Sequence, residues 1–84
     1  MTTDALRSLV LRLLQELAPE TDPASVDPDA DLREELDLDS MDELNLIARL
    51  SEELGCEVPE AEYPQLRTVN GAVDYLADRL ARQV

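Results

Sequence analysis

The chain has no histidine, lysine, phenylalanine or tryptophan, and it has only two tyrosines, two glycines and one cysteine. With aromatic residues nearly absent, the core has to be built from Leu, Val, Ile and Ala, which favours helices over a sheet. Two glycines supply few of the tight turns that β-hairpins use. Because 84 residues form a single hydrophobic core, we expect one all-α domain over residues 1–84.

These absences also limit the chemistry. The lone Cys56 allows neither an internal disulfide nor a cysteine-based metal site, and it predicts a cytoplasmic protein. Cys56 follows a glycine that ends a helix, so a core or half-buried position is expected. The N-terminal stretch lacks the uninterrupted apolar run of a signal peptide, and no segment reaches transmembrane length.

The charge is strongly one-sided: 20 acidic residues face seven arginines, for a net charge of −13. A surface of this sign repels phosphates, which argues against nucleic acid or an anionic membrane as a partner. It suits basic partner surfaces. The plainer alternative is that the acidity only keeps the protein in solution.

Apolar periodicity predicts a small four-helix bundle of three main helices and one short helix. The first runs over about residues 4–18, with Thr3 as N-cap and Pro19 after its end. The second covers residues 40–54 and ends at Gly55. Residues 56–67 form a connection with one short helical turn, limited by Pro64. Thr68 caps the last helix.

Residues 19–38 hold three prolines and many acids without a helical period, so they predict a long ordered loop. Its expected anchors in the core are apolar: Val26, Leu32, Leu36 and Leu38. Asp27, Asp29 and Asp31 resemble the opening of an EF-hand calcium loop. However, Leu32 replaces the required glycine and Leu38 the bidentate glutamate, so we expect no metal site.

The second helix has two different faces on a helical wheel. One arc is assigned to the core, where it is expected to line the interior with Leu13, Val73 and Leu76. That arc consists of Leu46, Ile47, Leu50 and Leu54. Met41, Leu44 and Ala48 form an apolar strip on the other side, with Asp42, Asn45 and Glu52 at its rim. The strip predicts a docking surface. In the alternative interpretation, Met41 and Leu44 fold under the loop as core.

Ser40 stands at the start of this helix and has two interpretations. Ser40 and Glu43 match the S-x-x-E capping box, in which the serine is only a cap. If Asp39 is the cap instead, Ser40 becomes the first helical residue and its hydroxyl is free. The unpaired amides of a helix N-terminus suit an attached phosphodiester, whereas the neighbouring acids oppose it.

Three motifs resemble the acyl carrier protein family, and with the N-terminal helix and the long acidic loop the resemblance covers nearly the whole chain. They are D-S-M-D-E-L-N-L-I-A-R-L-S-E-E-L-G at residues 39–55, C-E-V-P-E at residues 56–60, and T-V-N-G-A-V-D-Y-L at residues 68–76. The hallmark of the family is an Asp-Ser-Leu or Asp-Ser-Met triplet before an acidic, leucine-rich helix. The spacing of this triplet from V-P-E and from T-V-x-x-A-V-D-Y makes the resemblance specific.

The resemblance implies that Ser40 carries 4′-phosphopantetheine, with Asp39 as a contact of the transferase. In the family a separate phosphopantetheinyl transferase uses coenzyme A and Mg²⁺, and acyl groups are then held as thioesters on the arm. Partner enzymes of fatty-acid or polyketide biosynthesis would dock on Met41, Asp42, Leu44, Ala48 and Glu52. The chain itself would be a monomeric, non-catalytic carrier, consistent with its lack of histidine and lysine bases.

Some positions depart from the family pattern. Asp37 stands where many members have glycine, Asn45 and Ser51 replace residues that are often acidic, and Arg49 adds a positive charge. These departures weaken the match to the usual fatty-acid synthase partners and favour a dedicated pathway. The Asp-Ser-Met triplet also resembles D-alanyl carriers, so an aminoacyl cargo is an alternative, as is an unmodified helical adaptor. An enzyme that pairs Asp39 with Asp42 is disfavoured, since so small a bundle offers no cleft.

Overall fold

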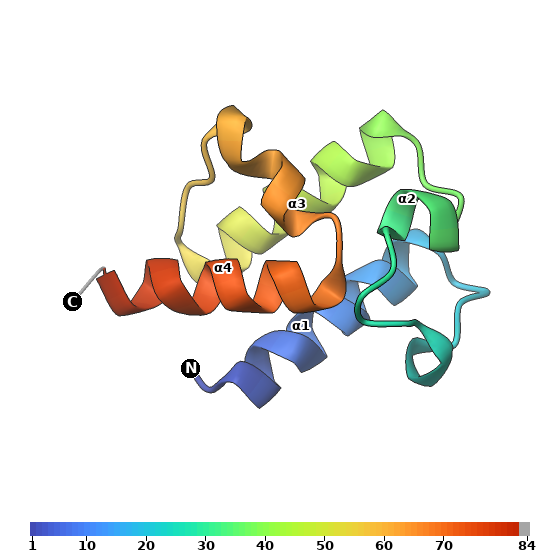
Figure 1. Ribbon diagram of the computed structural model, residues 1–84, viewed down its shortest axis with the longest axis horizontal. Coiled ribbons are helices and arrows are strands. Elements are labelled where there is room, and N and C mark those ends of the chain that lie inside the picture. Colours follow the sequence, from blue (N-terminus) through green and yellow to red (C-terminus); the bar gives the residue numbers. More distant parts are fainter. Residues whose placement is uncertain (83–84) are drawn as a thin grey trace.

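A computed structural model of the protein describes residues 1–82, and every regular element in that range is a helix (Figure 1). The all-α prediction is therefore confirmed. The elements in chain order are α1 (Thr3–Leu17), η1 (Pro23–Ser25), α2 (Leu32–Glu35), α3 (Ser40–Leu54), η2 (Glu60–Leu66) and α4 (Val69–Arg82). The two η elements are 3₁₀ helices.

Helix α1 begins one residue earlier than predicted. The cap is Thr2, not Thr3, because the Thr2 hydroxyl accepts a hydrogen bond from the Ala5 amide at 3.1 Å. At the other end Leu17 is the last helical residue, and the Ala18 amide donates to the Leu14 carbonyl at 2.9 Å. The buried residues of α1 are Leu6, Val10, Leu13 and Leu14, which follow a helical period.

The core lies where α1 and α4 run side by side, with α3 packed on α1 and η2 on α4 (Figure 1). Leu46, Ile47 and Leu50, three of the four core residues predicted in α3, are buried. So are the other predicted core residues, Leu13, Val73 and Leu76. Leu54 is the exception, since it is half-buried at the edge of the core. Cys56 is buried, as expected, with 1% of its surface exposed.

The segment from 19 to 38 is more ordered than the predicted loop, because it contains η1 and α2. Each has an aspartate cap: Asp22 accepts from the Ala24 amide at 3.0 Å, and Asp31 accepts from the Arg33 amide at 2.9 Å. Elements of three and four residues are too short to produce a helical period in sequence. The predicted anchors are confirmed, since Leu32 and Leu38 are buried and Val26 and Leu36 pack on the core.

The connection before α4 also differs from its prediction, because η2 extends over seven residues and contains Pro64. A 3₁₀ helix tolerates the proline because only one backbone donor is lost and its φ suits the turn. Thr68 caps α4 as predicted, accepting from the Gly71 amide at 2.9 Å. The Tyr75 hydroxyl of α4 donates to the Glu62 carboxylate of η2, and burial together with this bond raises the pKa of Tyr75 to about 12.

Two leucines of α3 test the division of this helix into an inner and an outer face. Leu50 is fully buried, whereas Leu44 is 45% exposed. Leu50→Ala should lower the free energy of unfolding by about 2–5 kcal/mol, because it opens a cavity in the core. Leu44→Ala should change it by only about 0.5 kcal/mol. Urea unfolding followed by far-UV circular dichroism measures both, and equal losses would contradict the assignment.

Candidate functional site

Asp39, not Ser40, caps α3. Its φ of −94° and ψ of −178° place it outside the helix, and its Oδ1 accepts from the Asp42 amide at 2.9 Å. The Asp42 carboxylate returns the bond by accepting from the Asp39 amide at 3.3 Å. This reciprocal pair is a capping box. The S-x-x-E interpretation of Ser40 and Glu43 is therefore wrong, because the cap lies one residue earlier.

Ser40 is the first residue of α3 and is exposed. Within residues 1–82 its hydroxyl takes no part in a side-chain hydrogen bond, since Asp39 does the capping. A helix leaves its first amides without intrahelical partners, and those amides favour a nearby anion. Since Ser40 is exposed among the described residues, the position fits a bulky phosphodiester substituent that projects into solvent.

The approach to Ser40 depends on a sharp change of direction at Asp37. Asp37 has a φ of +54°, the left-handed region that few residues other than glycine adopt. Aspartate is among the residues that tolerate it best. The position where the family pattern has glycine thus has, in this chain, a backbone conformation that glycine adopts readily. The turn sends Leu38 into the core and leaves Asp39 and Ser40 on the surface.

Glu43, one turn after Asp39, holds two arginines from other segments. Its carboxylate lies 3.8 Å from Arg33 Nη1 of α2 and 3.4 Å from Arg67 Nε, which follows η2. The Glu43 side chain is only 15% exposed. Sequence reasoning treated Glu43 only as a partner of Ser40 in capping, and no signal in the sequence linked residue 43 to residues 33 and 67.

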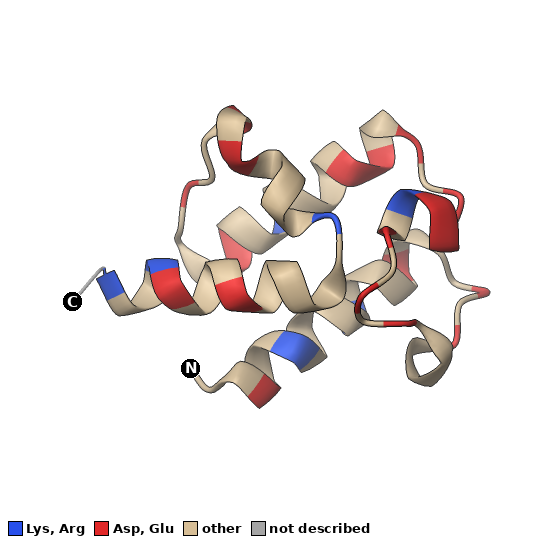
Figure 2. Ribbon diagram, in the orientation of Figure 1, with Lys and Arg blue, Asp and Glu red and all other residues tan. Residues whose placement is uncertain are grey.

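The surface around Ser40 is acidic (Figure 2). Asp37, Asp39 and Ser40 are exposed, and α2 adds the exposed Glu34 and Glu35. Because these carboxylates share one end of the molecule, their fields add. A phosphodiester attached there is attracted by the helix dipole and repelled by these acids. The acids favour the approach of a basic partner.

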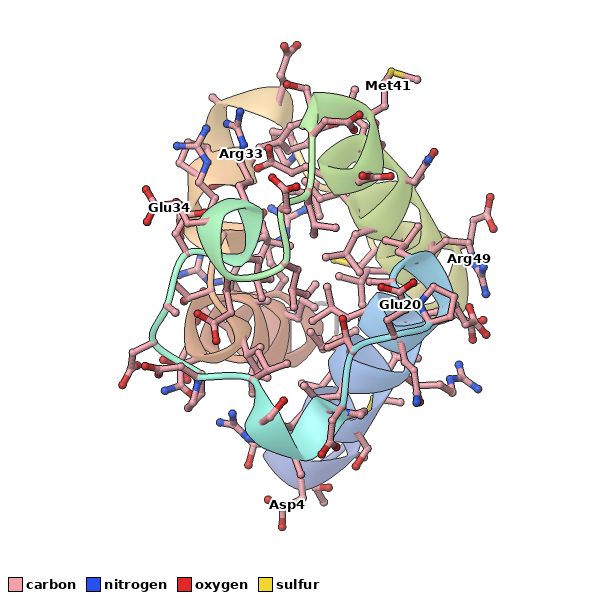
Figure 3. The ribbon with its side chains drawn as sticks, turned by 90° about the vertical axis from the view of Figure 1, so that its right-hand side faces the viewer. Asp4, Glu20, Arg33, Glu34, Met41 and Arg49 are labelled. Carbon is pink, nitrogen blue, oxygen red and sulfur yellow. The ribbon has the colours of Figure 1, made fainter. Side chains whose placement is uncertain are left out.

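The outward face of α3 starts beside Ser40, and Met41 projects there into solvent (Figure 3). Met41 is 65% exposed and Leu44 is 45% exposed, so the alternative in which both fold under the loop is wrong. Ala48 and Glu52 are exposed, and Asp42 is half-buried because it takes part in the cap. The five residues therefore lie on a largely accessible face that begins beside the serine and extends along α3.

Farther along α3, Arg49 forms ion pairs with acidic residues of the same chain. Arg49 Nη2 lies 3.2 Å from a carboxylate oxygen of Glu16 on α1 and 3.8 Å from one of Glu53. Arg12 also reaches Glu53, at 3.7 Å. Arg49 is therefore occupied by acids of its own chain, whereas Glu52 remains an exposed acid on the outward face.

The three aspartates that resembled a calcium loop have other partners. Asp27 Oδ1 accepts from the Asp29 amide at 2.9 Å, and Asp31 caps α2. Asp29 Oδ1 accepts from the Asn70 side chain at 2.7 Å, which fixes this segment to the start of α4. No cluster of three or more potential metal ligands occurs among residues 1–82, and no helix in that range is long and apolar enough to cross a membrane.

Comparison with known proteins gives one consistent result. The family model described as "Phosphopantetheine attachment site" matches residues 4–76. The acyl carrier protein of Rubrobacter xylanophilus is 37% identical over 75 residues, covering 86% of this chain and 93% of the relative. The "Polyketide-8 synthase acyl carrier protein 2" of Streptomyces avermitilis is 37% identical over 79 residues, which cover 94% of this chain and 91% of the relative. "Acyl carrier protein 2" of Ralstonia nicotianae is 42% identical over 60 residues, which cover 71% of this chain and 74% of the relative.

Alanine substitutions at two adjacent residues test which one caps α3. Asp39→Ala removes the acceptor of the Asp42 amide and should lower the free energy of unfolding by about 1 kcal/mol. Ser40→Ala should change it by no more than about 0.5 kcal/mol, because the hydroxyl caps nothing. Urea unfolding of both variants gives the comparison. A larger loss for Ser40→Ala than for Asp39→Ala would assign the cap to the serine.

Proposed function

Since the chain belongs to the acyl carrier protein family, with its phosphopantetheine attachment domain, we propose that Ser40 is the residue that receives the 4′-phosphopantetheine arm. The protein is a carrier and not a catalyst, and a phosphopantetheinyl transferase and acyl-processing enzymes are its partners. When attached, the arm supplies a terminal thiol that holds acyl groups as thioesters. The observation that carries the proposal is the exposed Ser40 hydroxyl, which the Asp39 cap leaves free.

The chemistry of attachment requires little from this chain. The Ser40 oxygen forms a bond to the phosphorus of coenzyme A that bears the pantetheine. The bond from that phosphorus to the oxygen bridging the two phosphates breaks, and 3′,5′-adenosine bisphosphate leaves. The serine proton passes to a base of the transferase, because this chain has no histidine or lysine to accept it. The role of the chain is to present the hydroxyl on a rigid helix end.

For the cargo we propose an acyl group of a fatty-acid or polyketide pathway. Support comes from relatives named simply as acyl carrier proteins and from one named as part of a polyketide synthase, at the same 37% identity. In both comparisons the matched region covers more than 90% of the relative's length.

We propose further that partner enzymes dock on the outward face of α3 through Met41, Asp42, Leu44, Ala48 and Glu52, using basic surfaces. An exposed methionine and leucine beside acidic side chains combine apolar contact with charge complementarity. Among residues 1–82 the exposed large apolar side chains are Met1, Met41 and Leu44. An apolar surface this small suits a monomer that binds its partners transiently.

Incubation with coenzyme A, Mg²⁺ and a broad-specificity phosphopantetheinyl transferase tests the attachment site. The intact mass of the wild-type chain should rise by one phosphopantetheine. Ser40→Ala should stay unmodified, because it lacks the hydroxyl that attacks phosphorus. Ser51→Ala, on the same helix, is the matched control and should be modified like the wild type. Modification of Ser40→Ala would place the arm elsewhere.

Charge reversal tests the docking surface. Glu52→Arg puts a positive charge on the proposed face, and Asp4→Arg makes the same change in the exposed first turn of α1. With the transferase as partner, kcat/KM should fall about tenfold for Glu52→Arg, because like charges oppose the encounter. It should remain near the wild-type value for Asp4→Arg. A similar loss in both variants would indicate a response to net charge alone and would remove the support for this face.

A further inference from the structure

We propose that Glu43 is an ionic latch that holds α2 and the Arg67 segment against the Ser40 end of α3. Its carboxylate contacts Arg33 Nη1 at 3.8 Å and Arg67 Nε at 3.4 Å, so one side chain joins α3 to two other segments of the chain. The latch is a property of the folded chain itself. Its consequence for carrier function rests on the proposed role of Ser40.

The latch is partly shielded from water, which sets it apart from ordinary surface ion pairs. The Glu43 side chain is 15% exposed, whereas each of its two arginines is 41% exposed. Exposed pairs contribute little because water and salt screen them, but a mostly buried carboxylate depends on its partners to offset lost hydration. Losing the charge of Glu43 should therefore affect the packing of the segments that it joins.

The segments that it joins are anchored in the core and at the start of α4, and their polar side-chain contact with α3 runs through Glu43. Helix α2 is a single turn of four residues, too short to be stable without tertiary contacts. Leu32 is buried, and its amide donates to the Arg67 carbonyl at 2.7 Å, so α2 and the Arg67 segment already form one unit. Helix α3 packs mainly on α1. Within residues 1–82, the side-chain ion pairs that join that unit to α3 are the two formed by Glu43 with Arg33 and Arg67.

The same helix provides a natural comparison at its other end. Glu53 also bridges two arginines, with Arg12 at 3.7 Å and Arg49 at 3.8 Å. Its side chain is 40% exposed, and it lies far from Ser40 on α3. Glu43 and Glu53 therefore differ in burial and in the segments that they join, while the number of arginine partners is the same.

The position of the latch suggests when it opens. It lies one turn from Ser40, on the acidic end that a basic partner would approach. An incoming lysine or arginine competes with Arg33 and Arg67 for the same carboxylate, which loosens the contact of α2 with the end of α3 that carries Ser40. Docking and local opening would then be coupled through one charge.

NMR-detected hydrogen exchange on the full, unmodified chain tests the latch directly. The reporting amides are those of Leu32, Glu35 and Leu36, which donate to Arg67, Asp31 and Leu32. Glu43→Gln keeps the shape of the side chain and removes its charge. It should lower the protection of these three amides about tenfold, while amides inside α1 and α4 keep theirs. Glu53→Gln should leave all of them unchanged.

Arg67→Gln is the second variant, because it weakens the latch and keeps the backbone carbonyl that accepts from Leu32. It should reproduce the selective loss in α2, so the proposal stays testable if Glu43→Gln does not fold. Unchanged α2 protection in the folded variants overturns the latch, and so does a uniform loss across all helices or an equal loss in Glu53→Gln. Since no arm is attached in this experiment, its outcome is independent of whether Ser40 is the attachment site.

Discussion

The reciprocal hydrogen bonds between Asp39 and Asp42 are the interaction on which the rest of the site depends. They satisfy the amides of Asp42 and of the cap residue Asp39 with carboxylates and not with a hydroxyl. Because the cap is one residue before Ser40, the serine enters the helix with its oxygen free. A capping serine would have its oxygen engaged with the backbone and would be a poor nucleophile. The difference between a structural serine and an attachment serine is thus a shift of one residue.

Helix α3 then performs two tasks with opposite faces. Its inner face, with Leu46, Ile47 and Leu50, supplies the core and fixes the helix against α1. Its outer face leaves Met41 and Leu44 in solvent next to Ser40. The core beneath fixes the position of this outer face, while Arg49 farther along the helix pairs with Glu16 and Glu53 of the same chain.

Much of this arrangement follows from sequence, because long amphipathic helices have a strong period. The inner face of α3 and the Thr68 cap were predicted from residue spacing, and only Leu54 proved half-buried. The short helix α2 was not, since a single turn leaves no periodic signal. A helical turn within residues 56–67 was predicted, but not the seven-residue length of η2. The role of Glu43 could not be predicted either, as its arginine partners come from distant segments. Asp37 was noticed as a departure from the family's glycine, yet only the structure gives its left-handed φ.

The central claim is that a single hydroxyl at the start of α3 bears the arm, and peptide mapping of the modified protein tests it most directly. Cleavage after Arg33 and Arg49 releases residues 34–49, in which Ser40 is the only hydroxyl side chain. Fragmentation of that peptide by mass spectrometry should find the phosphopantetheine on it, at residue 40. An arm located on any other peptide, with residues 34–49 unmodified, would contradict the account.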